Sequence, residues 1–78
     1  MVVDVITPDK TLFSGNAGLV RIPGIDGSFE VLDHHAPLVS IIVKGTVTII
    51  DDKKQNHDIE VNGGVIEVNN NTVKILAE

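Results

Sequence analysis

Three histidines and one aspartate are the residues whose types and spacing could most readily do chemistry. Asp33, His34 and His35 are consecutive, and carboxylate and imidazole groups are common metal ligands. Adjacent side chains on extended chain point to opposite faces, so His34 and His35 cannot easily hold one ion. The third histidine, His57, follows a charged turn. We therefore expect no metal site, and a positional or interface role for the Asp33–His35 stretch.

Serine and lysine side chains offer two other kinds of chemistry. A histidine could activate Ser28 or Ser40, but neither serine has a visible orienting acid or the sharp turn that presents a nucleophile. Lys53 lies in a polar turn between two β-rich segments, which is how lipoyl and biotinyl carrier domains present their modified lysine. A solvated hairpin tip explains Lys53 better, because turns of mixed acidic and basic residues are common. A carrier domain modified at Lys53 stays open as an alternative, and we expect no catalytic residue, bound cofactor or metal.

Composition narrows the classes of partner. Six basic and eleven acidic residues give a formal net charge of −5, and only two residues are aromatic. Nucleic-acid binding needs a basic face and stacking aromatics, so we expect no nucleic-acid partner. No apolar run approaches the roughly 20 residues of a membrane span, and the start lacks the basic stretch of a secretory signal. We expect a cytosolic domain whose surplus apolar surface meets another protein.

The elements that must position these residues are predicted to be strands. Val, Ile and Thr together supply 27 of the 78 residues, and β-branched side chains favour strands over helices. Short apolar segments alternate with Gly, Pro, Asn and Asp turns, a pattern typical of a β-sandwich or barrel. The predicted strands are Val2–Ile6, Ala17–Pro23, Ser28–Leu32, Leu38–Val43, Gly45–Ile50, Asp58–Val61, Val65–Val68 and Thr72–Leu76. We expect one all-β domain over residues 1–78.

One predicted strand is apolar on both faces. Most strands alternate apolar with polar residues and so place one side in the core. In Leu38–Val43, we predict that the odd positions form the core stripe and that Leu38, Ser40 and Ile42 form an apolar outer face. A two-layer sandwich has only one interior, so something else must cover that outer face. The cover is either a loop of this chain or a protein partner, and we favour the partner.

A series of motifs along most of the chain resembles a known family. The chain resembles the epsilon subunit of bacterial F-type ATP synthases (delta in mitochondria), in its amino-terminal β-sandwich domain. The matching residues are Val5-Ile6-Thr7-Pro8, Leu12-Phe13-Ser14-Gly15, Val20-Arg21-Ile22-Pro23-Gly24, Asp26-Gly27, His35-Ala36-Pro37-Leu38, Gly45, Val61–Val68 and Val73–Ala77. The order and spacing of the whole series carry the resemblance, since any one element would be weak alone.

The resemblance implies a fold, a location and partners. It implies a flattened sandwich of about ten strands on the central stalk, which binds the gamma subunit and the membrane ring of c subunits and catalyses nothing. Such a subunit would sit at the cytoplasmic face of the bacterial inner membrane without inserting into it, and would help to couple proton flow to ATP synthesis. By position in the motifs, Thr7, His35 and Ser40 match the gamma-facing surface, and we add Leu38 and Ile42 from the outer face above. The turn Ile25-Asp26-Gly27-Ser28 matches the loop that meets the ring.

Two departures from the family pattern matter. Most members continue into a two-helix hairpin that inhibits ATP hydrolysis, whereas this sequence ends at Glu78. The inhibitory and nucleotide-sensing roles are therefore not carried over, and a naturally short subunit is the expectation. Asp33-His34 stands where relatives usually have Pro-Gly or similar small turn residues.

Overall fold

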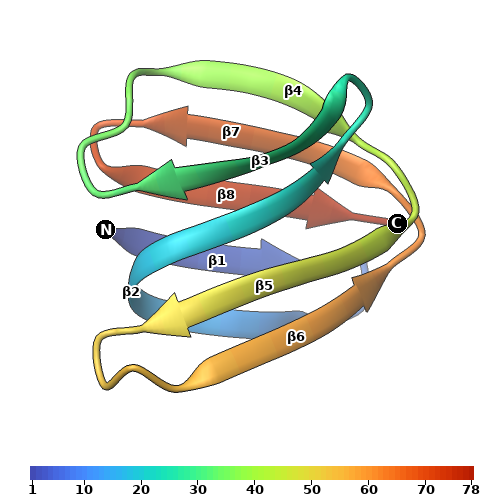
Figure 1. The fold of residues 1–78 in the computed structure, drawn as a ribbon. Helices are drawn as coiled ribbons and strands as arrows, with labels where there is room; N and C mark the ends of the chain where they lie inside the picture. Colours follow the sequence, from blue (N-terminus) through green and yellow to red (C-terminus); the bar gives the residue numbers. More distant parts are fainter.

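The computed structural model describes all 78 residues, and every regular element in it is a strand (Figure 1). All eight strands predicted from the sequence are present. They are β1 (Val2–Ile6), β2 (Thr11–Gly24), β3 (Gly27–Leu32), β4 (Leu38–Ile42), β5 (Gly45–Asp51), β6 (Asn56–Val61), β7 (Gly64–Asn69) and β8 (Thr72–Ala77). The structure has no helix whose length and apolar character would allow it to cross a membrane.

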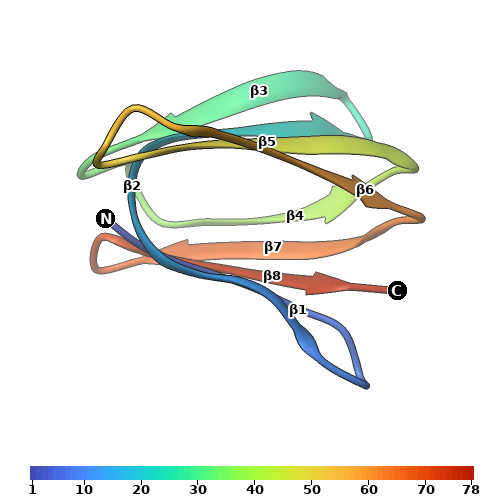
Figure 2. The same cartoon turned by 90° about the horizontal axis from the view of Figure 1, so that it is seen from below.

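The eight strands form two layers (Figure 2). One layer has the order β1-β8-β7-β4, and the other contains β3, the second half of β2, β5 and β6. Strand β2 serves both layers, because its first half pairs with β1 and its second half pairs with β3 and β5. The register of β2 shifts between Ala17 and Leu19, and such a bulge lets a strand bend. The two halves of β2 therefore act as two strands in different layers. Counted in this way, the number of strands comes close to the ten implied by the resemblance.

The start of β2 is the main boundary that the sequence does not predict. We expect the strand from Ala17, but it begins at Thr11. Ser14, Gly15 and Asn16 are turn-type residues with weak strand preference. Pairing with β1 holds them extended, with Val3 opposite Gly15 and Val5 opposite Phe13. Tertiary context therefore overrides local preference in this segment.

The core lies between the layers and is entirely apolar. Sixteen apolar residues are buried, and no polar or charged side chain is buried with them. Ile22 and Ile49 are among the largest buried side chains from one layer, and Ile66 and Ile75 from the other. Alternation along β1, β7 and β8 places every second side chain in this core, as the sequence predicts. The remaining side chains of those strands form the outer face of their layer.

Strand β4 corrects the prediction of which face is buried. Ile42 is 2% exposed, whereas Val39 and Ile41 are 72% and 54% exposed. Residues that pair across strands share a face, and Ser40 pairs with the buried Ile66. Leu38, Ser40 and Ile42 therefore point inward, and the predicted outer face was wrong by one residue. Both stripes of β4 are apolar, so the sequence gives no preference between them.

Candidate docking face

An exposed apolar row crosses four strands on the outer side of the β1-β8-β7-β4 layer. Cross-strand pairing aligns Ile41 with Val65, Val65 with Leu76, and Leu76 with Ile6. These four side chains are 54%, 39%, 52% and 37% exposed, in that order. Each occupies the outward phase of its strand, where an isolated domain would ordinarily place polar groups. We call these four residues the apolar row.

A second row, mostly charged, runs beside the apolar row. It aligns Val39, Glu67, Lys74, Asp4 and Ser14 through successive strand pairs. The Ser14 hydroxyl donates a hydrogen bond of 2.7 Å to a carboxylate oxygen of Asp4. No ion pair within the chain involves Lys74. We call this set the charged row, and the two rows together the docking face.

The docking face is hollowed on the side where β1 and β2 lie. The hollow has a volume of about 620 Å³. Its floor is formed by Ile6 and Leu76 of the apolar row. Its walls come from Asp4, Ser14, Glu67 and Lys74 of the charged row, together with Thr11. A concave surface with an apolar floor and polar walls suits the protruding side chains of a partner.

The outer side of the opposite layer is mostly polar, although Leu32 aligns there with the half-buried Leu19 and Ile50. Arg21 donates two hydrogen bonds, of 2.7 and 3.0 Å, to one carboxylate oxygen of Glu30. The Thr48 hydroxyl donates to Asp58 at 2.8 Å, and hydrogen bonds from Asn56 and Thr48 lower the pKa of the Asp58 carboxyl. Leu32, at the end of β3, is a large apolar residue on this face that is 52% exposed. The docking face has four aligned and exposed large apolar residues, whereas β3, β5 and β6 of the opposite layer have Leu32 alone.

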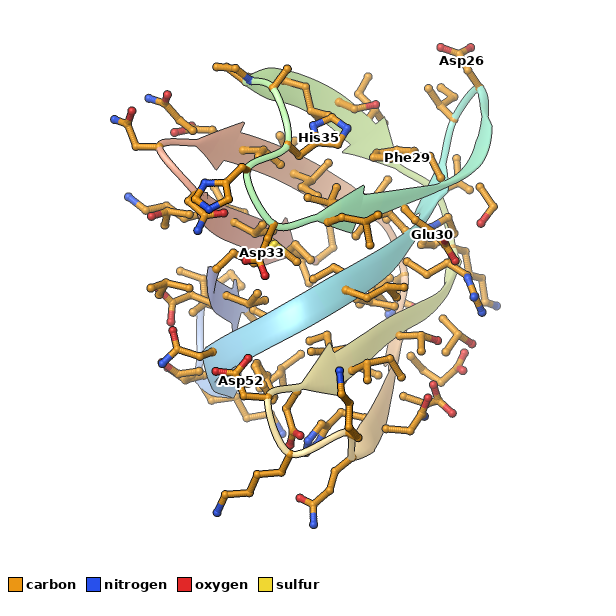
Figure 3. The ribbon with its side chains drawn as sticks, turned by 60° about the vertical axis from the view of Figure 1, so that its left-hand side comes forward. Asp26, Phe29, Glu30, Asp33, His35 and Asp52 are labelled. Carbon is orange, nitrogen blue, oxygen red and sulfur yellow. The ribbon has the colours of Figure 1, made fainter.

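The β2–β3 turn adjoins one end of the apolar row. The turn is exposed from Ile25 to Ser28, and Gly27 has a φ of +120°, which favours glycine. Figure 3 shows Asp26 at the outermost point of this turn. The backbone N–H of Ile25 donates to the carbonyl of Ile41 at 3.0 Å, which ties the turn to β4. The predicted ring-facing residues Ile25, Asp26, Gly27 and Ser28 therefore form one exposed loop.

The five residues predicted to face gamma do not share one surface. Thr7 borders the apolar row and lines a small hollow with Ile6 and Leu76. Its hydroxyl accepts hydrogen bonds from the N–H groups of Lys10 and Asp9 at 3.1 and 3.3 Å, so it shapes the β1–β2 turn. The other four lie on the β4 side of the molecule. His35 and Leu38 are half-buried, Ser40 is half-buried on the inner side of β4, and Ile42 is buried.

The apolar row contains residues that sequence reasoning missed. Ile6, Val65 and Leu76 each stand on the outward phase of their strand, two positions from a charged residue. Leu76 shares its face with Lys74, for example, and Val65 shares its face with Glu67. That break in alternation is the signal that could have found them. The three residues can be recognised as one surface only when the strand register is known, because the register places them side by side.

Asp33, His34 and His35 lie in the connection between β3 and β4. No group of three metal-ligating side chains gathers anywhere in the chain. The Asp33 carboxylate pairs with the α-ammonium group of Met1 at 2.5 Å, and this hydrogen bond lowers the pKa of Asp33. The backbone N–H of His34 donates to the Asn71 side chain at 2.7 Å. These contacts tie the β3–β4 connection to the β7–β8 turn, and no hydrogen bond joins Ser28 or Ser40 to a histidine.

The β5–β6 turn that carries Lys53 is organised by Asp51. One carboxylate oxygen of Asp51 accepts the backbone N–H groups of Lys53 and Gln55 at 2.8 and 2.9 Å. The other oxygen lies 2.8 Å from Nε2 of His57, whose ring centroid is 5.0 Å from that of Phe13. The hydrogen bonds to His57 and to these backbone groups lower the pKa of Asp51. The exposed Lys53 at the tip is the sole structural feature in favour of a carrier domain.

The fold and the docking face together define a small β-sandwich domain with a surface suited to another protein. Over residues 1–78, the chain matches the family described as the β-sandwich domain of the ATP synthase delta/epsilon chain. The chain belongs to this family. The resemblance seen in the sequence motifs is thereby confirmed.

Individual relatives agree with the family match. The ATP synthase epsilon chain of Maricaulis maris (strain MCS10) is 43% identical over 75 residues, which cover 96% of this chain and 56% of the relative. The epsilon chain of Chlorobium limicola is 36% identical over 76 residues, covering 97% of this chain and 86% of the relative. The chain thus spans about half the length of the Maricaulis relative and most of the Chlorobium one.

Solved structures share the fold. A chain in the cryo-EM structure of the Euglena gracilis mitochondrial ATP synthase, OSCP/F1/c-ring in rotational state 1, superposes with a TM-score of 0.92 at 18% identity. That match covers 99% of this chain and 49% of the other. A chain in the Tetrahymena thermophila mitochondrial ATP synthase structure, central stalk and c-ring, gives 0.82 at 18% identity, covering 97% and 61%.

Proposed function

We propose that this chain is a central-stalk subunit of an F-type ATP synthase. It binds the gamma subunit and the ring of c subunits, turns with both, and helps to couple proton flow to ATP synthesis. It is not catalytic and holds no cofactor. Family membership supports this role, as do relatives named ATP synthase epsilon chain.

The observation that carries the proposal is the apolar row. Removing four aligned and exposed aliphatic side chains from water lowers the free energy, and the outer face of the opposite layer exposes fewer such side chains. Gamma therefore covers the docking face. Val39 and Ile41 replace Leu38, Ser40 and Ile42 as the β4 residues of this contact, because they are the ones that point outward. Thr7 borders the face, and His35 lies beyond its β4 edge.

The β2–β3 turn is the contact to the ring. Ile25 is 56% exposed beside the carboxylate of Asp26, so the turn offers one apolar and one negative group at its tip. Its tie to Ile41 makes the ring contact continuous with the gamma contact. The subunit accordingly sits at the cytoplasmic face of the bacterial inner membrane, attached through its partners and without insertion of its own.

Capture from membranes tests the proposal. The tagged chain is used as bait on solubilised membranes of the source organism, and captured proteins are identified by mass spectrometry. Recovery of gamma and c subunits is the expected result. If a folded bait recovers neither subunit, the stalk role is wrong.

A charge reversal in the turn tests the ring contact separately. Asp26→Lys should reduce recovery of c subunits while recovery of gamma stays unchanged, because the turn lies at the end of the docking face and outside it. The exposed position of Asp26 makes unfolding an implausible cause. An unchanged amount of c subunits would remove Asp26 from the ring contact.

A further inference from the structure

We propose that the docking face also binds a second copy of this chain, so that the free subunit forms a two-fold symmetric dimer. The proposal rests on the order of side chains across the face, which is complementary to itself. It does not depend on the stalk role. A symmetric dimer uses the same patch on both copies, so each contact occurs twice.

We place a two-fold axis parallel to the strands, between β7 and β8. This axis lays the apolar row of one copy on the apolar row of the other, and the charged row on the charged row. It lays β7 of one copy over β8 of the other, and β4 of one over β1 of the other. Val65 then faces Leu76 of the second copy, and Ile41 faces Ile6 of the second copy. The strand axes of the two facing sheets are nearly parallel, which is the common aligned mode of sheet packing. The apolar row is thereby covered by its own copy.

The same axis pairs opposite charges. Glu67 faces Lys74 of the second copy, and Lys74 faces Glu67 of the second copy. Because Lys74 has no ion pair within its own chain, its ammonium group is available for this contact. Both residues lie on the two strands nearest the axis, where a twist between the sheets displaces opposing side chains least. The dimer therefore contains two equivalent ion pairs beside its apolar centre.

Shape agrees with charge. Val39 and Ile41 project most from the β4 side of the face, with exposures of 72% and 54%. The hollow of about 620 Å³ lies on the β1 side, over Ile6 and Leu76. Because the axis lays β4 of one copy over β1 of the other, the projecting residues of each copy enter the hollow of the other. The projecting residues and the hollow lie on opposite sides of the two-fold axis. A symmetric contact requires this arrangement, because the axis brings each side of the face onto the other.

The size of the face sets the expected strength. The molecule measures 26 × 24 × 18 Å, so its broad face offers at most about 600 Å² per copy. A total near 1,200 Å² is at the lower end of specific interfaces. The dimer should therefore dissociate on dilution. If gamma covers this face, as proposed above, gamma and the second copy exclude one another; that consequence alone rests on the proposed function.

Sedimentation equilibrium over a range of concentrations tests the dimer. The average mass should rise with concentration from the chain's 8.3 kDa toward twice that value. Glu67→Lys and Lys74→Glu should each weaken association roughly tenfold, because each places like charges opposite one another twice. The double variant, Glu67→Lys with Lys74→Glu, should regain the association of the original chain.

Two controls separate loss of association from loss of folding and from non-specific effects of a charge. Glu67 and Lys74 also neighbour each other within one chain, so unfolding at the lowest concentration must show that every variant is folded. Leu32→Asp, on the opposite layer, should leave association unchanged, whereas Leu76→Asp should abolish it. The proposal is overturned by a constant mass of 8.3 kDa, by association beyond two copies, or by a folded double variant that stays monomeric.

Discussion

At the scale of single residues, backbone conformation explains the departure at Asp33-His34. His34 has a φ of +63°, a left-handed conformation that costs a non-glycine residue roughly 1–2 kcal/mol. Glycine at position 34 would avoid that cost. This chain instead holds the turn with polar contacts, through Asp33 to Met1 and through the His34 N–H to Asn71.

Replacing His34 by glycine should therefore stabilise the chain. The exposed His34 side chain makes no hydrogen bond, and glycine keeps the N–H that donates to Asn71. Relief of strain outweighs the extra entropy of glycine in the unfolded chain by up to about 1 kcal/mol. Urea unfolding of His34→Gly measures the change. A variant less stable than the original chain would show that the turn is not strained.

The network around Asp51 predicts a dependence of stability on pH. Hydrogen bonds from His57, Gln55 and Lys53 lower the pKa of Asp51 below its ordinary value of 3.8. A carboxyl whose pKa is lower in the folded state adds stability above its unfolded pKa, and this is lost as the pH falls through the folded pKa. Asp51→Asn should therefore be less stable at neutral pH, and the difference from the original chain should shrink below about pH 4.

Denaturant unfolding between pH 7 and pH 3 measures this difference. Asp52→Asn is the matched control, since Asp52 is adjacent, exposed and accepts none of these hydrogen bonds. It should follow the original chain at every pH. A difference for Asp51→Asn that stays constant across the range would contradict the proposed linkage.

At the scale of elements, β4 decides which residues are core and which are surface. Ile42 is buried against the core, whereas the neighbouring Val39 and Ile41 point to solvent. Ile42→Ala should cost about 2–4 kcal/mol in the free energy of unfolding, because it leaves a cavity. Val39→Ala should change the same quantity by less than about 0.5 kcal/mol. Equal costs in urea unfolding would mean that the facing of β4 is misassigned.

The strands show what the sequence could and could not predict. Alternation in Thr72–Ala77 indicates both the strand and its buried side, because one phase is apolar and the other mostly polar; in Val2–Ile6 a single polar residue, Asp4, marks the outward phase. In β4 both phases are apolar, so only its pairing with β7 decides the facing. The extension of β2 back to Thr11 depends on β1, which no local pattern reports. The apolar row arises from register across four strands, so no single segment of sequence contains it.

At the scale of the whole molecule, the outer faces of the two layers differ in how much apolar surface they expose. A radius of gyration of 11.0 Å is close to the roughly 11.5 Å expected for a chain of this length, so no arm extends from the sandwich. Interlocked side chains between the layers resist shear, which suits a part that transmits torque. In the proposed complex, the docking face meets a partner and the more polar outer face of the opposite layer meets water. Because of this asymmetry, binding of a partner should depend on the residues of the docking face.

The most direct measurement compares two substitutions on opposite faces. Leu76 and Leu32 are each 52% exposed, and each is changed to Asp in turn. Binding of purified gamma is then measured at chain concentrations low enough to keep the subunit monomeric. We predict that Leu76→Asp weakens binding by about 2–4 kcal/mol, as expected for a buried contact residue, while Leu32→Asp leaves it unchanged. Equal binding by the two variants, or a loss confined to Leu32→Asp, would contradict the account.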